Sequence, residues 1–540
     1  MKRLEGDFDY IVVGAGTAGC IVANRLSADP KNRVLILEAG GNDDWIWFHI
    51  PVGYLFAIGN PRSDWMFRTE PEPGLNGRSL AYPRGKVIGG SSAINAMISM
   101  RGQAADYDHW RQLGLSGWGY DDVLPAFRRL EDHFLGESEH HGSGGGWRIE
   151  APRLSWAILD AVGDAAEQMG IRKIPDFNTG DNEGVGYFHV NQKRGRRWSS
   201  ARGFLKPALK RANLRLEKDV LVDRLIVENG RAVGVLFTRG GDIIEARARG
   251  EVILCAGSIG SAQVLHRSGI GPAEWLTPLG IESVLDRQGV GRNLQDHLCI
   301  DHLYRSRLPT LNQELGTWPG RVRVALRYAL LRRGPLAISV NQGGGFVRTR
   351  PDLPRPDMQL YFSPLSYTRG VPGKRALMRP DPFPGFLLSA QPCRPTSRGH
   401  LEIRSSDPLA PPLIHPNALS TEDDIHAMLD GTRFLRQLAA APSLAAIIAE
   451  EMAPGPGVQS DADLLEDIRQ RASSVFHPVS SCRMGPDPGA DVVDADLRVY
   501  GVEGLRVIDA SIFPAVTSGN TNAPTIMVAE KGADLVLRDV

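Results

Sequence analysis

The stretches FDYIVVGAGTAGCIVANRL (residues 8–26) and RVLILEAG (residues 33–40) predict a strand, a glycine-rich turn, a helix and a second strand. The turn has the spacing Gly14-x-Gly16-x-x-Gly19. In a dinucleotide site the first glycine permits the tight turn. The second lets the backbone approach a pyrophosphate, and the third lets the helix pack closely on the strand. The N-terminus therefore reads as one βαβ unit that opens a dinucleotide-binding domain.

The glycine spacing alone is weak evidence, because glycine fills 60 of the 540 positions and such a spacing can arise by chance. The neighbouring strand, helix and acidic residue make the prediction specific. Glu38 ends the second strand 19 residues after Gly19, close to the ~20 residues expected of the acid that binds the ribose. The pattern predicts a dinucleotide, either FAD or NAD, and does not choose between them.

Composition excludes several classes of protein. The 62 Lys and Arg residues balance 62 Asp and Glu residues, so no overall field attracts nucleic acid, and we expect no nucleic-acid partner. Five widely spaced cysteines form neither a disulfide framework nor a zinc-ribbon pattern and suit a reducing compartment. No apolar run approaches the ~18 to 20 residues of a membrane-spanning helix. Because a cleaved signal would remove the first strand, we expect a cytoplasmic protein.

Several further stretches resemble the signatures of the glucose-methanol-choline (GMC) oxidoreductases. They follow one another in family order across nearly the whole chain, and the resemblance is closest to the bacterial choline dehydrogenase-like branch. The stretches are RGKVIGGSSAIN (84–95), GSIGSAQ (257–263), GVGRNLQDH (289–297), His477-Pro478, and Asp509-Ala510-Ser511 with Thr521-Asn522-Ala523-Pro524.

The resemblance implies an α/β and α+β protein of two domains. A discontinuous, Rossmann-like FAD-binding domain would comprise residues 1–155, 201–305 and 473–540. A substrate domain, built on an antiparallel sheet covered by helices, would comprise residues 156–200 and 306–472. Length alone would instead suggest three or four consecutive domains.

The resemblance also implies that the dinucleotide is FAD. Some family members attach FAD covalently through a histidine of the first signature. Ile94 stands at that position here, so we expect FAD to be bound without a covalent bond. The residues expected to contact it are Gly14, Gly16, Thr17, Ala18, Gly19, Glu38, Ala39, Arg84, Val87, Gly89, Gly90, Ser91, Asn95, Ala96, Met97, Ile98, Val220, Asp509, Ala510, Asn520 and Pro524.

The expected chemistry is oxidation of an alcohol, which we take to be primary, to an aldehyde. A base near the hydroxyl makes hydride release easier and typically contributes ~10²–10⁴-fold. His477 matches the catalytic position of the family, and Asn522 matches the position of a second His or Asn that orients the substrate oxygen. We expect His297 to be structural. The flavin would be reoxidised by a quinone-type acceptor or by O2, and the sequence leaves that choice and the identity of the alcohol open.

Two alternatives remain at this point. One is a light-driven fatty-acid decarboxylase on the same scaffold, and the other is a flavin-binding protein that has lost turnover. The presence of both His477 and Asn522 disfavours each of them.

Two basic segments have no place in this scheme. We interpret KRGRR (193–197) as a solvated loop. The segment RVRVALRYALLRR (321–333) places one apolar face among arginines, formed by Val322, Ala325, Leu326, Ala329 and Leu330. We favour a surface helix that packs on its own protein. The alternative is peripheral contact with an anionic membrane, which would suit an enzyme that delivers electrons to quinone.

Overall fold

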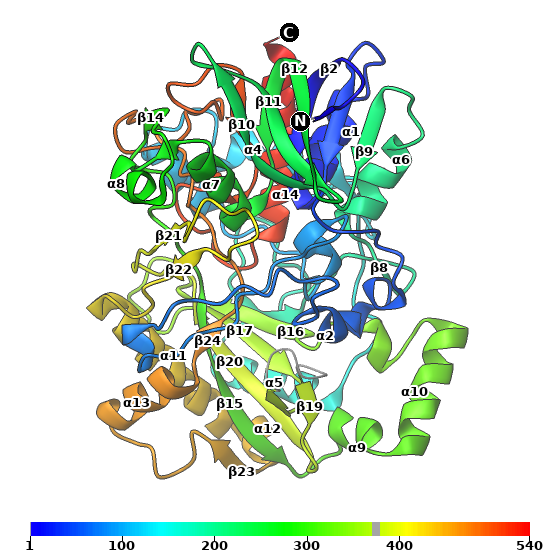
Figure 1. Ribbon diagram of the computed structural model, residues 1–540. Coiled ribbons are helices and arrows are strands. Elements are labelled where there is room, and N and C mark those ends of the chain that lie inside the picture. The colour runs from blue at the N-terminus through cyan, green and yellow to red at the C-terminus, as the bar shows by residue number, and fades with distance from the viewer. Residues whose placement is uncertain (1, 370–377, 540) are drawn as a thin grey trace.

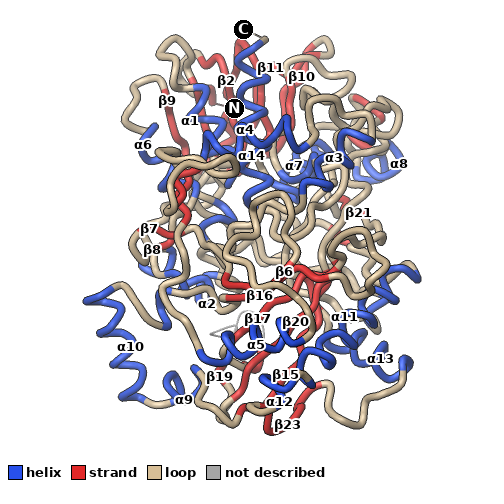
Figure 2. Tube along the Cα trace, turned by 180° about the vertical axis from the view of Figure 1, so that it is seen from behind, coloured by secondary structure: helices blue, strands red, loops and turns tan. Residues whose placement is uncertain are grey.

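The computed structural model describes residues 2–369 and 378–539, and its two large sheets lie at opposite ends of the molecule (Figure 1). Seen from behind, loops fill much of the layer between them (Figure 2). The cofactor and substrate segments thus meet through loops held by a sheet on either side.

The first sheet has the strand order β10-β11-β12-β2-β3-β9, and β1 and β25 also pair with β12. Its strands are β1 (Lys2–Arg3), β2 (Phe8–Val13), β3 (Val34–Leu37), β9 (Leu214–Glu217), β10 (Leu221–Glu228), β11 (Arg231–Arg239), β12 (Asp242–Leu254) and β25 (Leu505–Val507). The pairs β2·β3, β3·β9, β12·β2 and β12·β25 are parallel. All four residues of β3 are apolar and buried, and β2 is buried except at Asp9, as expected where strands pair in parallel. The predicted Rossmann-like architecture is confirmed.

The two ends of the chain complete this layer together. The helix α1 (Thr17–Leu26) packs on α14 (Asn522–Arg538), which also packs on α4 (Tyr120–Leu130). Arg25 of α1 forms ion pairs with Glu530 and Asp534 of α14. The dinucleotide turn therefore depends on a helix about 500 residues further along the chain.

The second sheet is antiparallel, with the order β23-β15-β20-β17-β16-β6 and β24 beside β15. Its strands are β6 (Gly184–Tyr187), β15 (Leu298–Ser306), β16 (Gly343–Val347), β17 (Met358–Ser363), β20 (Gly385–Pro392), β23 (Ile448–Ala453) and β24 (Ser473–Ser474). The helices α5 (Ala157–Gln168) and α11 (Glu422–Ala440) pack against it through apolar side chains. The predicted antiparallel sheet covered by helices is confirmed.

Two crossings between the sheets lie elsewhere than the sequence suggested. We placed residues up to 305 in the FAD-binding segment, but β15 begins at Leu298 and pairs in the second sheet. We placed residues from 473 in the last FAD-binding segment, but β24 also pairs with β15. Both strands are continuous with stretches that carry cofactor motifs, so the motifs do not mark where the chain changes sheets.

Shorter elements connect these layers. They are α2 (Tyr54–Ala57), α3 (Ala104–Gln112), α6 (Lys206–Ala208), α7 (Gly257–Arg267), α8 (Ala273–Leu276), α9 (Leu311–Gly316), α10 (Trp318–Leu331), α12 (Pro442–Ala445), α13 (Asp461–Arg471), β4 (Glu131–His133), β5 (Trp147–Ile149), β7 (Gln192–Lys193), β8 (Arg196–Arg197), β13 (Ile270–Gly271), β14 (Leu285–Asp286), β18 (Tyr367–Arg369), β19 (Met378–Pro380), β21 (His400–Glu402) and β22 (Leu413–His415). In the described part of the chain, no helix combines the length and apolar character that a bilayer crossing requires.

Replacing Gly19 by alanine should disrupt the packing of α1 on β2. A Cβ at this position would lie 1.8 Å from the Gly14 carbonyl oxygen, so strand and helix must separate. We expect the free energy of unfolding to fall by roughly 1 to 3 kcal/mol and flavin content to drop. Gly457→Ala is the control, because nothing lies within 4 Å of its Cβ position. Equal melting temperatures of the two variants would contradict this account.

Candidate active site

The dinucleotide turn forms a cradle of exposed backbone. Gly14 ends β2 with a left-handed φ of +99°, and a Cβ there would lie 2.6 Å from the Cys255 carbonyl oxygen. A Cβ at Gly90 would lie 2.7 Å from the Cα of Gly16. At Gly16 itself, no heavy atom comes closer than 3.9 Å to the Cβ position. The turn is therefore tightly packed at Gly14 and Gly90 and open at Gly16. Next to this opening α1 begins at Thr17, and the N–H groups of its first turn are available to a ligand.

Glu38 lies beside this turn at the end of β3. Its carboxylate oxygens accept hydrogen bonds of 2.8 Å from the backbone N–H groups of Ala15 and Gly40. Burial raises the pKa of the carboxyl to about 7, although both hydrogen bonds oppose that shift. The Val220 N–H donates to the Glu38 carbonyl oxygen at 3.0 Å. The two residues expected at the adenosine end thus lie next to each other.

A cavity of about 720 Å³ extends from this cradle to the second sheet. The expected cofactor residues that line it are Gly14, Gly16, Thr17, Ala18, Glu38, Ala39, Arg84, Gly90, Ser91, Asn95, Ala96, Met97, Ile98, Val220, Asp509, Ala510 and Asn520, and the expected catalytic residues His477 and Asn522 line it too. Gly19, Val87, Gly89 and Pro524 are not among the lining residues. Gly19 instead serves the packing of α1, and Val87 belongs to a small apolar cluster with Ile94.

His477 is held at the cavity by its neighbours on both sides. Its backbone N–H donates to Asp296 Oδ1 at 2.8 Å, and its Nδ1 lies 3.0 Å from Nδ1 of His297. The Nε2 of His297 lies 3.0 Å from the Cys393 carbonyl oxygen. His297, which we expected to be merely structural, therefore touches the candidate base. The 180 residues between them hid this contact from sequence analysis.

These contacts determine the tautomer of His477. A carbonyl oxygen only accepts, so Nε2 of neutral His297 carries its proton and Nδ1 is left as an acceptor. The Nδ1 of His477 must then donate to it, which leaves a lone pair on Nε2 of His477. Burial, His297 and the Arg84 guanidinium hold the pKa of His477 well below 6.5. Burial also lowers the pKa of His297 to about 4. Both rings are neutral near pH 7.

The two asparagines differ from our expectation. The Asn520 Nδ2 lies 3.1 Å from Nε2 of His477, and its Oδ1 accepts from Gln359 Nε2 at 3.4 Å, which orients the amide. Asn522 is instead the first residue of α14, and its Oδ1 accepts from Thr17 Oγ1 at 3.0 Å. Among the described residues no hydrogen bond joins Asn522 to His477. In this structure Asn520, and not Asn522, contacts the candidate base, and the catalytic role of Asn522 stays a prediction.

The second sheet supplies the opposite wall of the cavity. Asp301, Ser389 and Tyr361 are directly opposite one another on β15, β20 and β17, and all three line the cavity. Ser389 Oγ donates to Asp301 Oδ1 at 2.7 Å. Tyr361 Oη donates to Gln359 Oε1 at 3.0 Å, and Gln359 in turn orients Asn520. None of these wall residues stood out in the sequence, because strands of this kind carry no motif.

Comparison with known proteins agrees with this arrangement. Residues 8–299 and 395–529 match two family models, both described as GMC oxidoreductase. The chain belongs to the GMC oxidoreductase family. It is 40% identical over 538 residues to an alcohol dehydrogenase [acceptor] of Pseudomonas putida, covering 99% of this chain and 96% of the relative. It is also 40% identical over 543 residues to an oxygen-dependent choline dehydrogenase of Vibrio vulnificus, covering 99% and 95%.

Solved structures show the same fold. Pyridoxine 4-oxidase from Mesorbium loti superposes with a TM-score of 0.88 at 31% identity, covering 98% of this chain and 99% of that one. Formate oxidase superposes with a TM-score of 0.91 at 26% identity, covering 99% of both chains. This chain is accordingly an FAD-dependent GMC oxidoreductase.

The residues around the cavity suit FAD. The open front of Gly16 and the start of α1 offer backbone N–H groups to a pyrophosphate. The Nδ2 of Asn522 is buried and, among the described residues, has no hydrogen-bond partner, although Asn522 lines the cavity. A buried N–H donor without a partner lowers the stability of the fold unless a bound group accepts a hydrogen bond from it.

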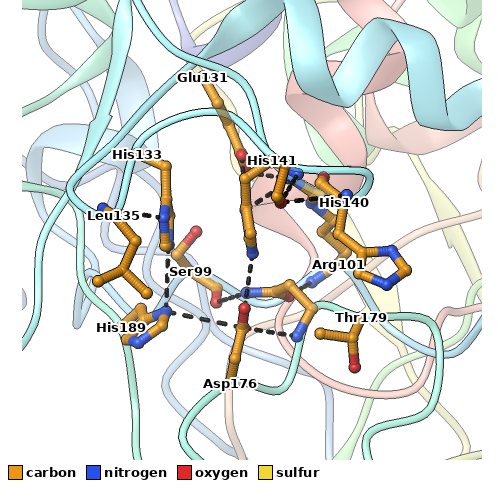
Figure 3. Close-up of polar contacts among 12 residues, drawn as sticks. Ser99, Arg101, Glu131, His133, Leu135, His140, His141, Asp176, Thr179 and His189 are labelled. Atoms are coloured by element: carbon orange, nitrogen blue, oxygen red, sulfur yellow. Dashed lines mark hydrogen bonds and ion pairs between the residues drawn. The ribbon is translucent and has the colours of Figure 1, made fainter.

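A second group of histidines lies outside this cavity wall (Figure 3). His141 stands between two carboxylates, with Nδ1 2.9 Å from Glu131 Oε2 and Nε2 2.6 Å from Asp176 Oδ2. Arg101 Nη2 lies 2.5 Å from the other oxygen of Glu131. Burial alone would lower the pKa of His141, but its bonds to Asp176 and Glu131 raise it above 6.5. With His141 protonated, two cations face two anions, and the buried charges balance.

His133 stacks on His141, with ring centroids 3.8 Å apart and ring planes within 11°. Its Nε2 lies 3.4 Å from Nδ1 of His189. Burial, and then the neighbouring His141 and His189, lower the pKa of His133 to about 4. His133 is 2% exposed, so it is buried as a neutral ring.

Replacing His133 by phenylalanine should change how stability depends on pH. The folded-state pKa of about 4 lies below the ordinary 6.5, so the unfolded chain binds a proton first as the pH falls. Neutral His133 thus makes its full contribution to the free energy of unfolding above pH 6.5. That contribution is lost as the pH falls from 6.5 to 4, by at most about 1.4 kcal/mol per pH unit. Urea unfolding across this range should show a shallower acid loss for His133→Phe than for the wild type.

The control is His109→Phe, an exposed histidine on α3. If both variants lost stability in acid as steeply as the wild type, the buried neutral state of His133 would be ruled out.

Proposed function

We propose that this oxidoreductase converts a primary alcohol to an aldehyde and that His477 is the base. The observation that supports this most directly is the lone pair on Nε2 of His477, placed at the cavity beside the Asn520 amide. The relatives named alcohol dehydrogenase and choline dehydrogenase support an alcohol as the substrate class. Quinone-type acceptors and O2 both remain candidates for reoxidation.

The proton movement follows from the hydrogen bonds of His477. An alcohol hydroxyl that donates to Nε2 can accept a hydrogen bond from Asn520 Nδ2 on the same oxygen. As Nε2 takes the proton, Nδ1–H keeps its bond to His297, which prevents the ring from turning away. The Asn520 N–H then stabilises the negative charge that develops on the oxygen. FAD, when bound, supplies the hydride acceptor.

The chain holds FAD, in this proposal, through the cradle of Gly14, Gly16 and Gly90 at the pyrophosphate and through Glu38 at the ribose. No covalent bond is expected, because the Ile94 side chain has no atom that could form one. In this proposal the first sheet holds the cofactor, and the second sheet forms the wall that faces the substrate.

Asp301 bears on the choice of substrate. It places a carboxylate in the substrate wall, hydrogen bonded to Ser389, and a carboxylate can balance a quaternary ammonium group. Choline and uncharged primary alcohols should therefore be tested side by side, first for anaerobic bleaching of the flavin. Admission of air or of a soluble quinone then shows which acceptor restores the yellow colour.

Replacing His477 by alanine should leave FAD bound and slow its reduction by alcohol by ~10²–10⁴-fold, because the proton acceptor is lost. Stopped-flow absorbance under anaerobic conditions measures that step directly. His426→Ala, an exposed histidine on α11, serves as the control. Unchanged single-turnover reduction in His477→Ala would refute the assignment of the base.

The two asparagines can be told apart by separate readouts. Asn520→Ala should retain flavin and slow its reduction by roughly 10²–10³-fold, the usual cost of one donor to a developing oxyanion. Asn522→Ala should mainly weaken FAD binding, because Asn522 bonds Thr17 at the cradle. Flavin content after gel filtration and single-turnover rates decide between them. If Asn522→Ala alone slowed reduction at full flavin occupancy, our original choice of Asn522 would be correct.

A further inference from the structure

The helix α10 (Trp318–Leu331) stands at the margin of the second-sheet half of the molecule, beside α9 (Figure 1). Its inner face packs on the protein through Val324 and Tyr328, which are 2% and 3% exposed. Because these two residues lie four apart, they define one side of the helix. The apolar face that we singled out in the sequence is on the other side. α10 is thus a surface helix that packs on its own protein, as we favoured, but it does so through Val324 and Tyr328 and not through that apolar face.

The outer face is apolar and exposed. Trp318, Leu326 and Leu330 are 77%, 56% and 78% exposed, and Leu331 at the helix end is 62% exposed. Ala325 and Ala329 are exposed as well. At 3.6 residues per turn, one continuous arc lies opposite Val324, formed by Trp318, Val322, Ala325, Leu326, Ala329 and Leu330. Single exposed leucines are ordinary, but an arc of this kind marks a binding surface.

Arginines border this arc on both sides. By helical spacing Arg321 lies along one edge, and Arg323 and Arg327 lie along the other. α10 contains no acidic residue, and across the described residues no ion pair engages its arginines. In a chain of zero net charge, this leaves a local surplus of positive charge around an apolar strip.

The second basic segment lies next to α10. Residues 193–197 form the β7–β8 hairpin, and the Tyr328 hydroxyl of α10 donates to the Gly195 carbonyl oxygen at 3.0 Å. Lys193, Arg194 and Arg196 of this hairpin are exposed. The two basic segments, about 130 residues apart in the chain, thus meet in space.

We propose that the outer face of α10 docks on an anionic phospholipid bilayer. An apolar strip bordered by arginines matches the acyl and phosphate layers of a membrane surface, and a tryptophan at the end of the strip suits the interface between them. The positive border favours negatively charged headgroups over zwitterionic ones. The inner face stays on the protein, so docking requires no rearrangement of α10.

Docking would bring the cavity close to the bilayer. Four residues after α10 the chain enters a short 3-10 turn (Pro335–Ala337), and Val340 and Asn341 then line the cavity. An acceptor dissolved in the membrane would thereby be near its site of reduction, a consequence that rests on the proposed function. The docking itself does not, and it is tested without turnover.

The test is flotation of the FAD-loaded protein with vesicles of phosphatidylcholine, with and without phosphatidylglycerol. We expect binding only to vesicles that contain phosphatidylglycerol, and loss of that binding at high salt. Arg323→Gln combined with Arg327→Gln should weaken it by roughly 30-fold, because each charge near an anionic surface is worth about fivefold. Leu326→Glu combined with Leu330→Glu should abolish it.

Matched controls are Ile243→Glu, 54% exposed on β12, and Arg224→Gln on β10. Both should bind as the wild type does, and all variants should retain flavin. The proposal fails if the wild type does not bind phosphatidylglycerol vesicles, or if the Leu326 and Leu330 variant binds as Ile243→Glu does. It also fails if sedimentation shows a wild-type dimer that this variant dissociates, since a second copy would then cover the strip.

Discussion

One backbone carbonyl, that of Cys393, determines which nitrogen of His477 can take a proton. It accepts from His297, and His297 can then only accept from His477. Without that carbonyl, both rings could turn or exchange tautomers, and the lone pair on Nε2 would no longer be assured. The tautomer of the proposed base is thus determined by Cys393, whose side chain does not line the cavity. Cys393 directly follows β20, so the substrate sheet controls the protonation of a residue on a cofactor loop.

The cavity depends equally on both sheets. The first sheet provides the crowded glycine turn and the start of α1, and the second provides a row of three side chains in register, Asp301, Ser389 and Tyr361. Gln359 links the row to Asn520 on the loop before α14. Side chains that face substrate and base are therefore oriented by a network that crosses from one sheet to the other, so they cannot shift independently.

Sequence reasoning succeeded where the chemistry is local. The turn at Gly14, Gly16 and Gly19 and the acid at Glu38 are determined by spacing within about 25 residues, and the structure places them together. It did not anticipate that Asn520 contacts His477, because Asn520 and Asn522 share one turn and only the start of α14 at Asn522 decides which amide faces His477. Sequence reasoning could not predict the contact between His297 and His477. It also could not predict that Val324 and Tyr328 form the inner face of α10. Both findings depend on tertiary packing.

The pairing of α1 with α14 has a consequence for how the protein is made. Arg25 is translated about 500 residues before its partners Glu530 and Asp534. The parallel sheet is likewise incomplete until β25 is synthesised. The first layer of the nascent chain therefore stays incomplete, with apolar strands uncovered, until β25 and α14 have been made. We therefore expect FAD to bind only after α14 has been made, and we expect the growing chain to need chaperones that shield its exposed strands.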